Sequence, residues 1–248
     1  MDFTELNRKR EYYLANRHLI PSDILNKYEN AFRIEYTHNS TAIEGNTLSL
    51  IETKLIIEDK ISVGGKNMRE LHEVENHDKA FEYVKECVGE NKTLDENTVK
   101  DIHEILMQNI FPGGIYRNVS VRITGAAFQP PPPDEMYFQI KNFYADMLYK
   151  KKAMHPVEFA AWTHAEFVKI HPFKDGNGRT ARMIMNYRLL SDGWLPVSVN
   201  KDDRLNYYNA LESYAVLNNI EPFVKLIADL ENKELVQMIE IIRQIIKQ

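Results

Sequence analysis

The sequence lacks several features that define whole classes of protein. It contains a single cysteine, Cys87, so no disulfide can form within the chain, which is typical of a reducing compartment. It has no run of about 18 apolar residues, and its N-terminus, MDFTELNRKREYY, lacks the apolar stretch of a signal peptide. These absences predict a cytoplasmic protein that makes no contact with a membrane.

A large charge excess of either sign is also absent. The formal net charge is −5 over 248 residues, so nucleic acid is not the expected partner. Hydrophobic residues make up 44% and charged residues 27%, as in ordinary globular proteins, and the length suffices for a substantial core. We therefore predict a folded protein in which any binding site for an anion is local.

Helical periodicity dominates the hydrophobic pattern. Asp95 and Asp134 are predicted N-caps of their helices, and Pro156 and Pro222 suit first helical turns. Helices are predicted over residues 21–43, 49–60, 68–88, 95–109, 134–151, 156–170, 177–192, 202–216, 221–231 and 232–247. The pattern predicts an all-α protein.

One segment departs from this pattern. VSVRITGAAFQPPPP, residues 119–133, alternates β-branched with polar side chains, reaches Gly125, and ends in four prolines. It predicts a short β-hairpin with an exposed edge, followed by a rigid extended stretch.

The most informative stretch is HPFKDGNGRTAR, residues 171–182, which lies between two predicted helices. Taken alone, its DGNG tetrapeptide is typical of an ordinary turn. Here the glycines fall at the N-terminus of the second helix, where free backbone N–H groups and the helix dipole favour a phosphate. The context therefore predicts an anion site.

The side chains of this stretch extend that prediction. Arg179 and Arg182 are three residues apart on one helix side, where both can bind the anion. Asp175 offers a hard oxygen to Mg²⁺, which commonly accompanies a polyphosphate. His171 can accept a proton near neutral pH. Together these residues predict phosphoryl or nucleotidyl transfer.

Position for position, residues 171–182 resemble the signature of the Fic family (filamentation induced by cyclic AMP). The resemblance covers residues 67–231 and includes GIYR at 114–117, YYNAL from Tyr207 and EPFVKLIADL from Glu221. It implies the Fic fold, an all-α helical bundle with a short β-hairpin flap over the active site. We expect one domain, 1–248, with N-terminal helices in 1–60, the Fic core in 67–231 and a C-terminal helix in 232–248.

The C-terminal helix, ELVQMIEIIRQIIKQ, leaves two arrangements open. Its Ile-rich face can be buried within the same chain or against a second copy in a homodimer.

Most characterised members of the family transfer AMP from ATP to a hydroxyl side chain of a protein. The resemblance implies that His171 is the general base for a Ser, Thr or Tyr hydroxyl of the target and that Asp175 holds Mg²⁺. The phosphates would be bound by the backbone around Gly176, Asn177 and Gly178, by the Asn177 side chain, and by Arg179 and Arg182.

Phosphorylating members carry lysine where this chain has Gly178, so transfer of AMP is favoured. Transfer of another nucleotide or of phosphocholine stays open. So does a regulatory module that binds nucleotide with little turnover.

Two further assignments follow from the resemblance, each beside a plainer alternative. The flap, with Val121, Arg122, Ile123 and Thr124, would bind an extended segment of the target by strand addition; alternatively it only covers the core. Tyr207 and Tyr208 would stack on the adenine of ATP, although tyrosines at a helix start are as often core residues.

STAIEGN, residues 40–46, resembles the Fic inhibitory motif, with Ser40, Glu44 and Gly45 in register. Read alone, Glu44 is a solvated carboxylate in the last turn of a helix. The resemblance implies instead that Glu44 pairs with Arg182 and blocks productive ATP binding. In some relatives the same glutamate helps water to remove AMP from the target, so reverse deAMPylation is a secondary hypothesis.

Overall fold

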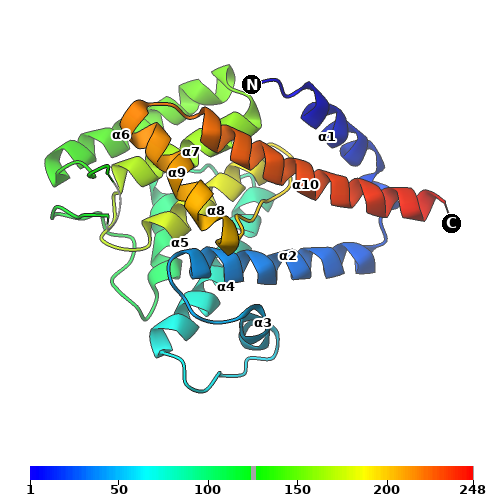
Figure 1. Cartoon of the computed structure of the whole chain (residues 1–248), viewed down its shortest axis with the longest axis horizontal. Helices are drawn as coiled ribbons and strands as arrows, with labels where there is room; N and C mark the ends of the chain where they lie inside the picture. The colour runs from blue at the N-terminus through cyan, green and yellow to red at the C-terminus, as the bar shows by residue number, and fades with distance from the viewer. Residues whose placement is uncertain (124–126, 248) are drawn as a thin grey trace.

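Two helices, α7 (Pro156–Ile170) and α8 (Asn177–Ser191), pack against each other at the centre of the protein (Figure 1). The computed structural model describes residues 1–123 and 127–247. Around the central pair lie α1 (Thr4–Asn16), η1 (Arg17–Leu19), α2 (Ser22–Ile43), α3 (Leu50–Glu58), α4 (Met68–Gly89), α5 (Glu96–Met107), α6 (Pro133–Ala153), η2 (Lys201–Asp203), α9 (Arg204–Leu217) and α10 (Glu221–Ile246).

Helix α8 is buried on nearly all sides, because α7, α4, α5 and α2 all pack against it. Its polar side chains are therefore buried too, including Arg179, Arg182 and Asn186. A helix enclosed in this way needs no single apolar stripe, and its polar side chains must find partners inside the protein.

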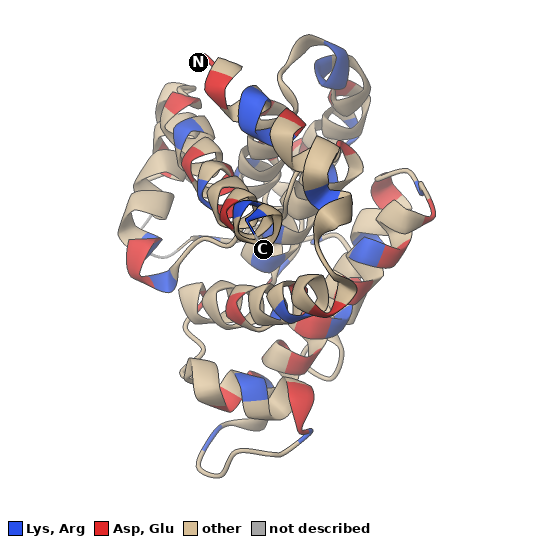
Figure 2. Ribbon diagram, turned by 90° about the vertical axis from the view of Figure 1, so that its right-hand side faces the viewer, with Lys and Arg blue, Asp and Glu red and all other residues tan. Residues whose placement is uncertain are grey.

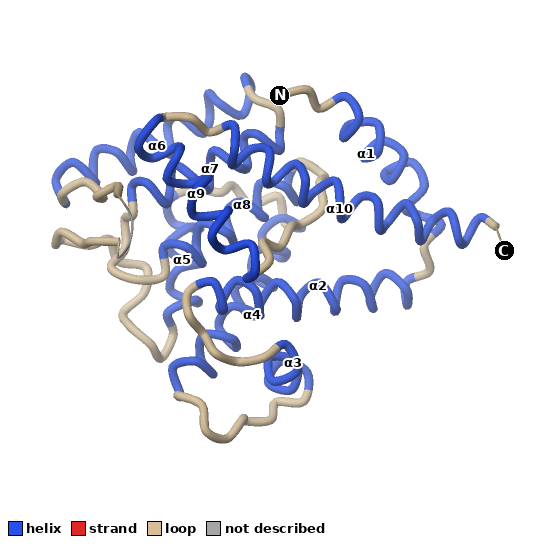
Figure 3. The backbone as a smooth tube through the Cα atoms, in the orientation of Figure 1, coloured by secondary structure: helices blue, strands red, loops and turns tan. Residues whose placement is uncertain are grey.

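The all-α prediction is confirmed for the described residues, in which every regular element is a helix (Figure 3). The predicted β-hairpin is not assigned as strands in 119–123 or 127–133. The turn of that hairpin, residues 124–126, lies outside the part of the chain that the structure describes.

Most of the predicted helix starts are confirmed. Asp95 accepts a hydrogen bond from the Thr98 N–H at 2.9 Å, as an N-cap does, and Pro156 and Pro222 lie in first turns. The prediction for Asp134 is wrong: α6 begins at Pro133, which leaves Asp134 within the first turn. Proline at the first helical position has a suitable φ and needs no N–H partner, so the helix can begin there.

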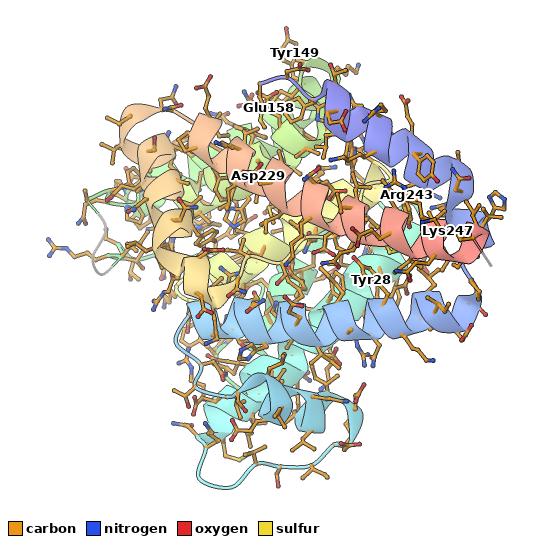
Figure 4. All side chains as sticks on the ribbon, turned by 45° about the vertical axis from the view of Figure 1, so that its right-hand side comes forward. Tyr28, Tyr149, Glu158, Asp229, Arg243 and Lys247 are labelled. Carbon is orange, nitrogen blue, oxygen red and sulfur yellow. The ribbon has the colours of Figure 1, made fainter. Side chains whose placement is uncertain are left out.

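The two helices predicted over 221–231 and 232–247 are one continuous helix, α10. No glycine or proline interrupts it after Pro222, and Ile227, Leu235 and Ile242 all join the main hydrophobic core. The apolar face is therefore buried within the same chain, which favours the first of the two arrangements left open by the sequence. In Figure 4 this helix runs past Asp229 to Lys247, with Tyr28 of α2 beside it.

Helix α1 was not among the predicted helices, because its sequence TELNRKREYYLAN is mostly polar. It packs along α10 (Figure 1) and buries Leu6 and Tyr13. Arg10 fixes it to the turn after α8 by donating to the carbonyl of Asp192 at 2.6 Å and to that of Gly193 at 3.1 Å. Polar side chains thus supply much of its attachment.

Acidic and basic residues alternate along the helices of the face presented in Figure 2. Among the described residues, no helix has the length and apolarity that crossing a membrane requires.

We expect Ile242→Ala to lower the free energy of unfolding by about 2–5 kcal/mol, because it removes buried methyl groups from the core. Ile242 has no exposed surface, whereas Ile246 in the next turn is 56% exposed. The control, Ile246→Ala, should change stability by less than about 0.5 kcal/mol. Equal losses for the two variants in urea denaturation would contradict the burial of α10 within its own chain.

Candidate active site

The loop between α7 and α8 is shaped by its own side chains. His171 ends α7 in the left-handed region with φ of 52°, and Gly176, with φ of 76°, precedes α8. The Asn177 amide closes the loop: its oxygen accepts from the Phe173 N–H, and its nitrogen donates to the Phe173 carbonyl, both at 2.9 Å. The resemblance assigns this amide to phosphate binding, but here both of its polar atoms hold the loop.

The N-terminus of α8 presents free donors. The first bond of this helix runs from the Thr180 N–H to the Gly176 carbonyl at 3.0 Å. The N–H groups of Asn177, Gly178 and Arg179 therefore have no carbonyl partner within α8, and the positive end of the helix dipole lies beside them. This is the arrangement that binds phosphate at helix N-termini.

The His171 side chain is held by the backbone of α7. Its Nδ1 lies 3.2 Å from the Val168 carbonyl, which can only accept, so Nδ1 carries the proton. Burial lowers the pKa of His171 to about 4, so the ring is neutral near pH 7. Its Nε2 therefore has a free lone pair with which to take a proton.

Arg182 is buried, with its side chain 1% exposed, and is held from two sides. From α2, the Ser40 hydroxyl accepts from Nε, while the Ser40 carbonyl and Glu44 Oε1 accept from Nη2, all at 2.8 Å. From α9, the Tyr207 hydroxyl accepts from Nη1 at 3.2 Å. A Cβ added at Gly178 would overlap Glu44 Oε1, so the carboxylate lies directly on the α8 N-terminus.

Asp175 is surrounded by cationic groups. Its Oδ1 accepts from the Gly176 N–H at 2.6 Å and lies 3.5 Å from Arg179 Nη2, while Oδ2 contacts Arg69. Burial acts to raise the pKa of Asp175, but Arg179 and the bonds from Arg69 and Gly176 hold it below its ordinary value. The Arg179 guanidinium also lies 3.5 Å from Glu73 Oε1.

The donor set at Asp175 suits Mg²⁺, which commonly binds one or two carboxylates and completes its shell with substrate phosphates and water. The Asp175 side chain is 40% exposed, so its carboxylate can be reached from solvent. Among residues 1–123 and 127–247 no cluster of three or more His, Cys, Asp or Glu side chains could hold a metal by itself. A metal here would take its remaining ligands from water or from a bound phosphate.

A cavity of about 690 Å³ opens beside the loop, within the size range of small-molecule sites. It is bounded by the α7–α8 loop, the N-terminus of α8, the residue that follows α2, helix α9 and the segment predicted as a flap. Residues that line it include His171, Gly178, Glu44, Tyr207, Tyr208 and Ile123.

The Fic/DOC family model matches residues 93–189. The solved structure of Fic-1 from C. elegans is similar to this protein, with 30% sequence identity and a TM-score of 0.82. The match covers 96% of this chain and 70% of the Fic-1 chain. The chain belongs to the Fic/DOC family.

A Fic-domain-containing signaling protein from Bacteroides thetaiotaomicron is 25% identical, with 95% of this chain and 97% of that chain covered and a TM-score of 0.83. The protein adenylyltransferase Fic of Culex quinquefasciatus is 34% identical over 94% of this chain and 46% of its own length. The chain spans about half the length of the curated relatives that it matches.

The two tyrosines that the Fic resemblance assigns to adenine differ in environment. Tyr207 is buried, and its hydroxyl contacts His164 Nε2 at 3.0 Å as well as Arg182. Tyr208 is 38% exposed and donates to the Ile43 carbonyl at 3.4 Å. Both line the cavity, but the hydroxyl of Tyr207 belongs to the polar network around Arg182.

Described residues of the segment predicted as a flap form one wall of the same cavity. Ile123 and Phe128 line it, and Ala127 donates its N–H to Glu212 Oε1 of α9 at 2.6 Å. The predicted docking residues within the described range are Val121, Arg122 and Ile123; Thr124 lies outside it.

Arg117 had no predicted role, although it is the last residue of the GIYR match. The side chain is fully buried and donates to three backbone carbonyls: His171 at 2.7 Å, Val119 at 2.9 Å and Pro131 at 2.5 Å. The Arg117 N–H also donates to the Pro172 carbonyl at 2.9 Å. One arginine thus ties the proposed base to both ends of the flap segment.

His103 of α5 was also missed, because nothing in the sequence around it indicates a partner. Its Nδ1 accepts a hydrogen bond from the Gly114 N–H, and its Nε2 donates one to the Asp175 carbonyl, both at 2.9 Å. Its ring stacks on the ring of Phe173. Burial lowers the pKa of His103 to about 4, which keeps the ring in this one-donor, one-acceptor form. A Cβ at Gly176 would lie 3.2 Å from Nε2, so glycine allows this approach.

We expect Arg117→Met to lower the free energy of unfolding by about 3 kcal/mol, because it leaves buried carbonyls without donors while conserving most of the volume. The control is Arg122→Met, which removes an exposed arginine from the same segment and should cost less than about 0.5 kcal/mol. Denaturant unfolding measures both. An equally small loss for Arg117→Met would mean that its three bonds contribute nothing.

Proposed function

We propose that this Fic chain transfers AMP from ATP to a hydroxyl side chain of a target protein, and that Glu44 inhibits the reaction. The observation that carries the proposal is the placement of the His171 base and the α8 N-terminus on one cavity of nucleotide size. The relatives named protein adenylyltransferase, at 32–38% identity, support the choice of AMP.

In the proposed step the target hydroxyl oxygen attacks the α-phosphorus of ATP. The bond from that phosphorus to the oxygen that bridges to the β-phosphate breaks, so pyrophosphate leaves. His171 Nε2 takes the proton of the hydroxyl, while its Nδ1–H stays on the Val168 carbonyl. The pKa of about 4 keeps His171 unprotonated at neutral pH, but it also makes the ring a weaker base. Close positioning of the target hydroxyl and the α-phosphorus must offset that loss.

Positioning of the phosphates would supply most of the rate enhancement. The free N–H groups of Asn177, Gly178 and Arg179 would cradle the phosphates, with Arg179 and Arg182 as partners for the leaving pyrophosphate. Mg²⁺ on Asp175 would neutralise charge on the α- and β-phosphates. These assignments use the free donors of α8 and leave the Asn177 amide in its structural place.

The contact of Glu44 with Arg182 supports the inhibitory role. The carboxylate lies on the arginine and against Gly178, where a phosphate would make the same two contacts. While Glu44 stays there, the γ-phosphate of ATP has no open position on Arg182. The same carboxylate lines the cavity with His171, so hydrolytic removal of AMP from a modified target is a second activity to test.

The described flap residues support docking of a target beside the base. Ile123 and Phe128 form a wall of the cavity, and an extended segment with a Ser, Thr or Tyr could lie along the flap toward His171. The lone cysteine supports a reducing, cytoplasmic setting for this reaction.

We expect Glu44→Gly to raise the transfer of label from α-labelled ATP to protein by about tenfold to a hundredfold, since a charge-assisted bond of about 1.5–3 kcal/mol is removed. Glu44→Gly/His171→Ala should transfer none. The control is Glu35→Ala, an exposed glutamate on the same helix, which should label as the wild type does. Equal labelling of wild type and Glu44→Gly would overturn the inhibition. No label on any variant would favour the regulatory module.

The pH dependence tests the base. Since the pKa of His171 is lowered to about 4, kcat/KM of the Glu44→Gly variant should hold its level below pH 6.5 and fall only as pH approaches that lower value. A profile that falls with a midpoint at 6.5 or above would contradict a buried, neutral His171 as the base in the free enzyme.

A further inference from the structure

Arg69, in the first turn of α4, lies outside the Fic signature but contacts it. Its Nη2 donates to Asp175 Oδ2, which lies 106 residues further along the chain. Its Nε donates to Glu73 Oε1 at 3.1 Å, one helical turn along α4. The Arg69 guanidinium is therefore held between the α4 carboxylate and the carboxylate proposed to hold Mg²⁺.

The two oxygens of Asp175 are not equivalent. Oδ1 already accepts from the Gly176 N–H at 2.6 Å and lies 3.5 Å from Arg179. Oδ2 has Arg69 as its hydrogen-bond partner among the described residues. The oxygen best able to bind a cation from solution is therefore the one on which Arg69 lies.

The surroundings of Arg69 would allow it to leave. Its side chain is 52% exposed, so the guanidinium can be hydrated when it lets go of Asp175. Glu73 is nearly buried and would remain as its partner, since the Glu73 bond uses Nε and not Nη2. Ion pairs between exposed side chains contribute little to stability, so a divalent ion can displace this one.

The same contacts connect the cation position to the inhibitory segment. Glu73 Oε2 accepts from the Asn46 side chain at 3.1 Å, and Asn46 follows Glu44 by two residues. Glu73 Oε1 also lies 3.5 Å from Arg179 Nη1. Release of Arg69 from Asp175 would thus change the charge around the Glu73 carboxylate, which also contacts Arg179 and Asn46.

We infer that Arg69 is a built-in counter-ion which competes with Mg²⁺ for Asp175 Oδ2, so that it weakens metal-assisted nucleotide binding. The inference rests on the proposed function, because it presumes that a nucleotide and Mg²⁺ bind at this site. Arg69 is a positioning residue of the ligand-free site, and it leaves Asp175 when the metal arrives.

The test measures ADP affinity by calorimetry, once with excess EDTA and once with excess Mg²⁺. ADP is chosen because it lacks the γ-phosphate, whose proposed position on Arg182 is taken by Glu44. The ratio of the two dissociation constants reports how far the metal assists binding. Arg69→Gln should raise this ratio about three- to fivefold and leave the EDTA value unchanged, because the cation that competes with Mg²⁺ is gone.

Three controls belong to this measurement. Arg69→Lys keeps the positive charge and should keep the wild-type ratio. Arg8→Gln removes an exposed arginine from another glutamate pair, far along the chain in α1, and should change neither constant. With Asp175→Asn the ratio should fall toward one, and adding Arg69→Gln to that variant should have no further effect.

A wild-type ratio above one that Arg69→Gln leaves unchanged would overturn the inference and leave the proposed function standing. Weaker ADP binding by Arg69→Gln in EDTA would also overturn it, because Arg69 would then be a phosphate ligand. Absence of ADP binding by the wild type with or without Mg²⁺ would overturn the proposed function, and the inference with it.

Discussion

The buried guanidinium of Arg182 is the constraint on which the site depends. A charge with almost no exposed surface is costly unless hydrogen-bond acceptors surround it, and the partners of the Arg182 side chain all come from outside α8. Ser40 and Glu44 at the end of α2 and Tyr207 at the start of α9 supply the partners. Those two helices must therefore meet α8 at the same level, which places Glu44 and Tyr207 together on the wall of the cavity.

The rest of the loop follows a similar rule, with buried side chains donating to backbone carbonyls. Arg117 holds the His171 backbone, His103 holds the Asp175 backbone, and Asn177 holds Phe173. These bonds fix the loop before any ligand arrives, so little ordering remains when phosphate binds. Charges within the site are also paired, because Glu44 lies on Arg182 and Arg69 lies on Asp175.

Much of the fold could be predicted because helices depend on local pattern. Spacing of apolar residues and capping residues located nine of the helical segments, and Asp95 capped as expected. The errors have local causes as well. Asp134 is not the N-cap because α6 already begins at Pro133. Helix α1 was not predicted because its sequence is mostly polar, and Arg10 attaches it to backbone carbonyls. The sequence had no glycine or proline to justify the division of α10.

The sequence by itself determined which side chains come together within residues 171–182. One turn and the helix after it place a histidine, a carboxylate, free N–H groups and two arginines at neighbouring positions. A family resemblance, and not spacing, paired Glu44 with Arg182 across 138 residues. Only the tertiary structure decided that Arg69 contacts Asp175 and that Arg117 donates to three carbonyls. It also decided that the hydroxyl of Tyr207 accepts a hydrogen bond from Arg182. Such contacts depend on how helices distant in sequence pack, and no local pattern of residues encodes that packing.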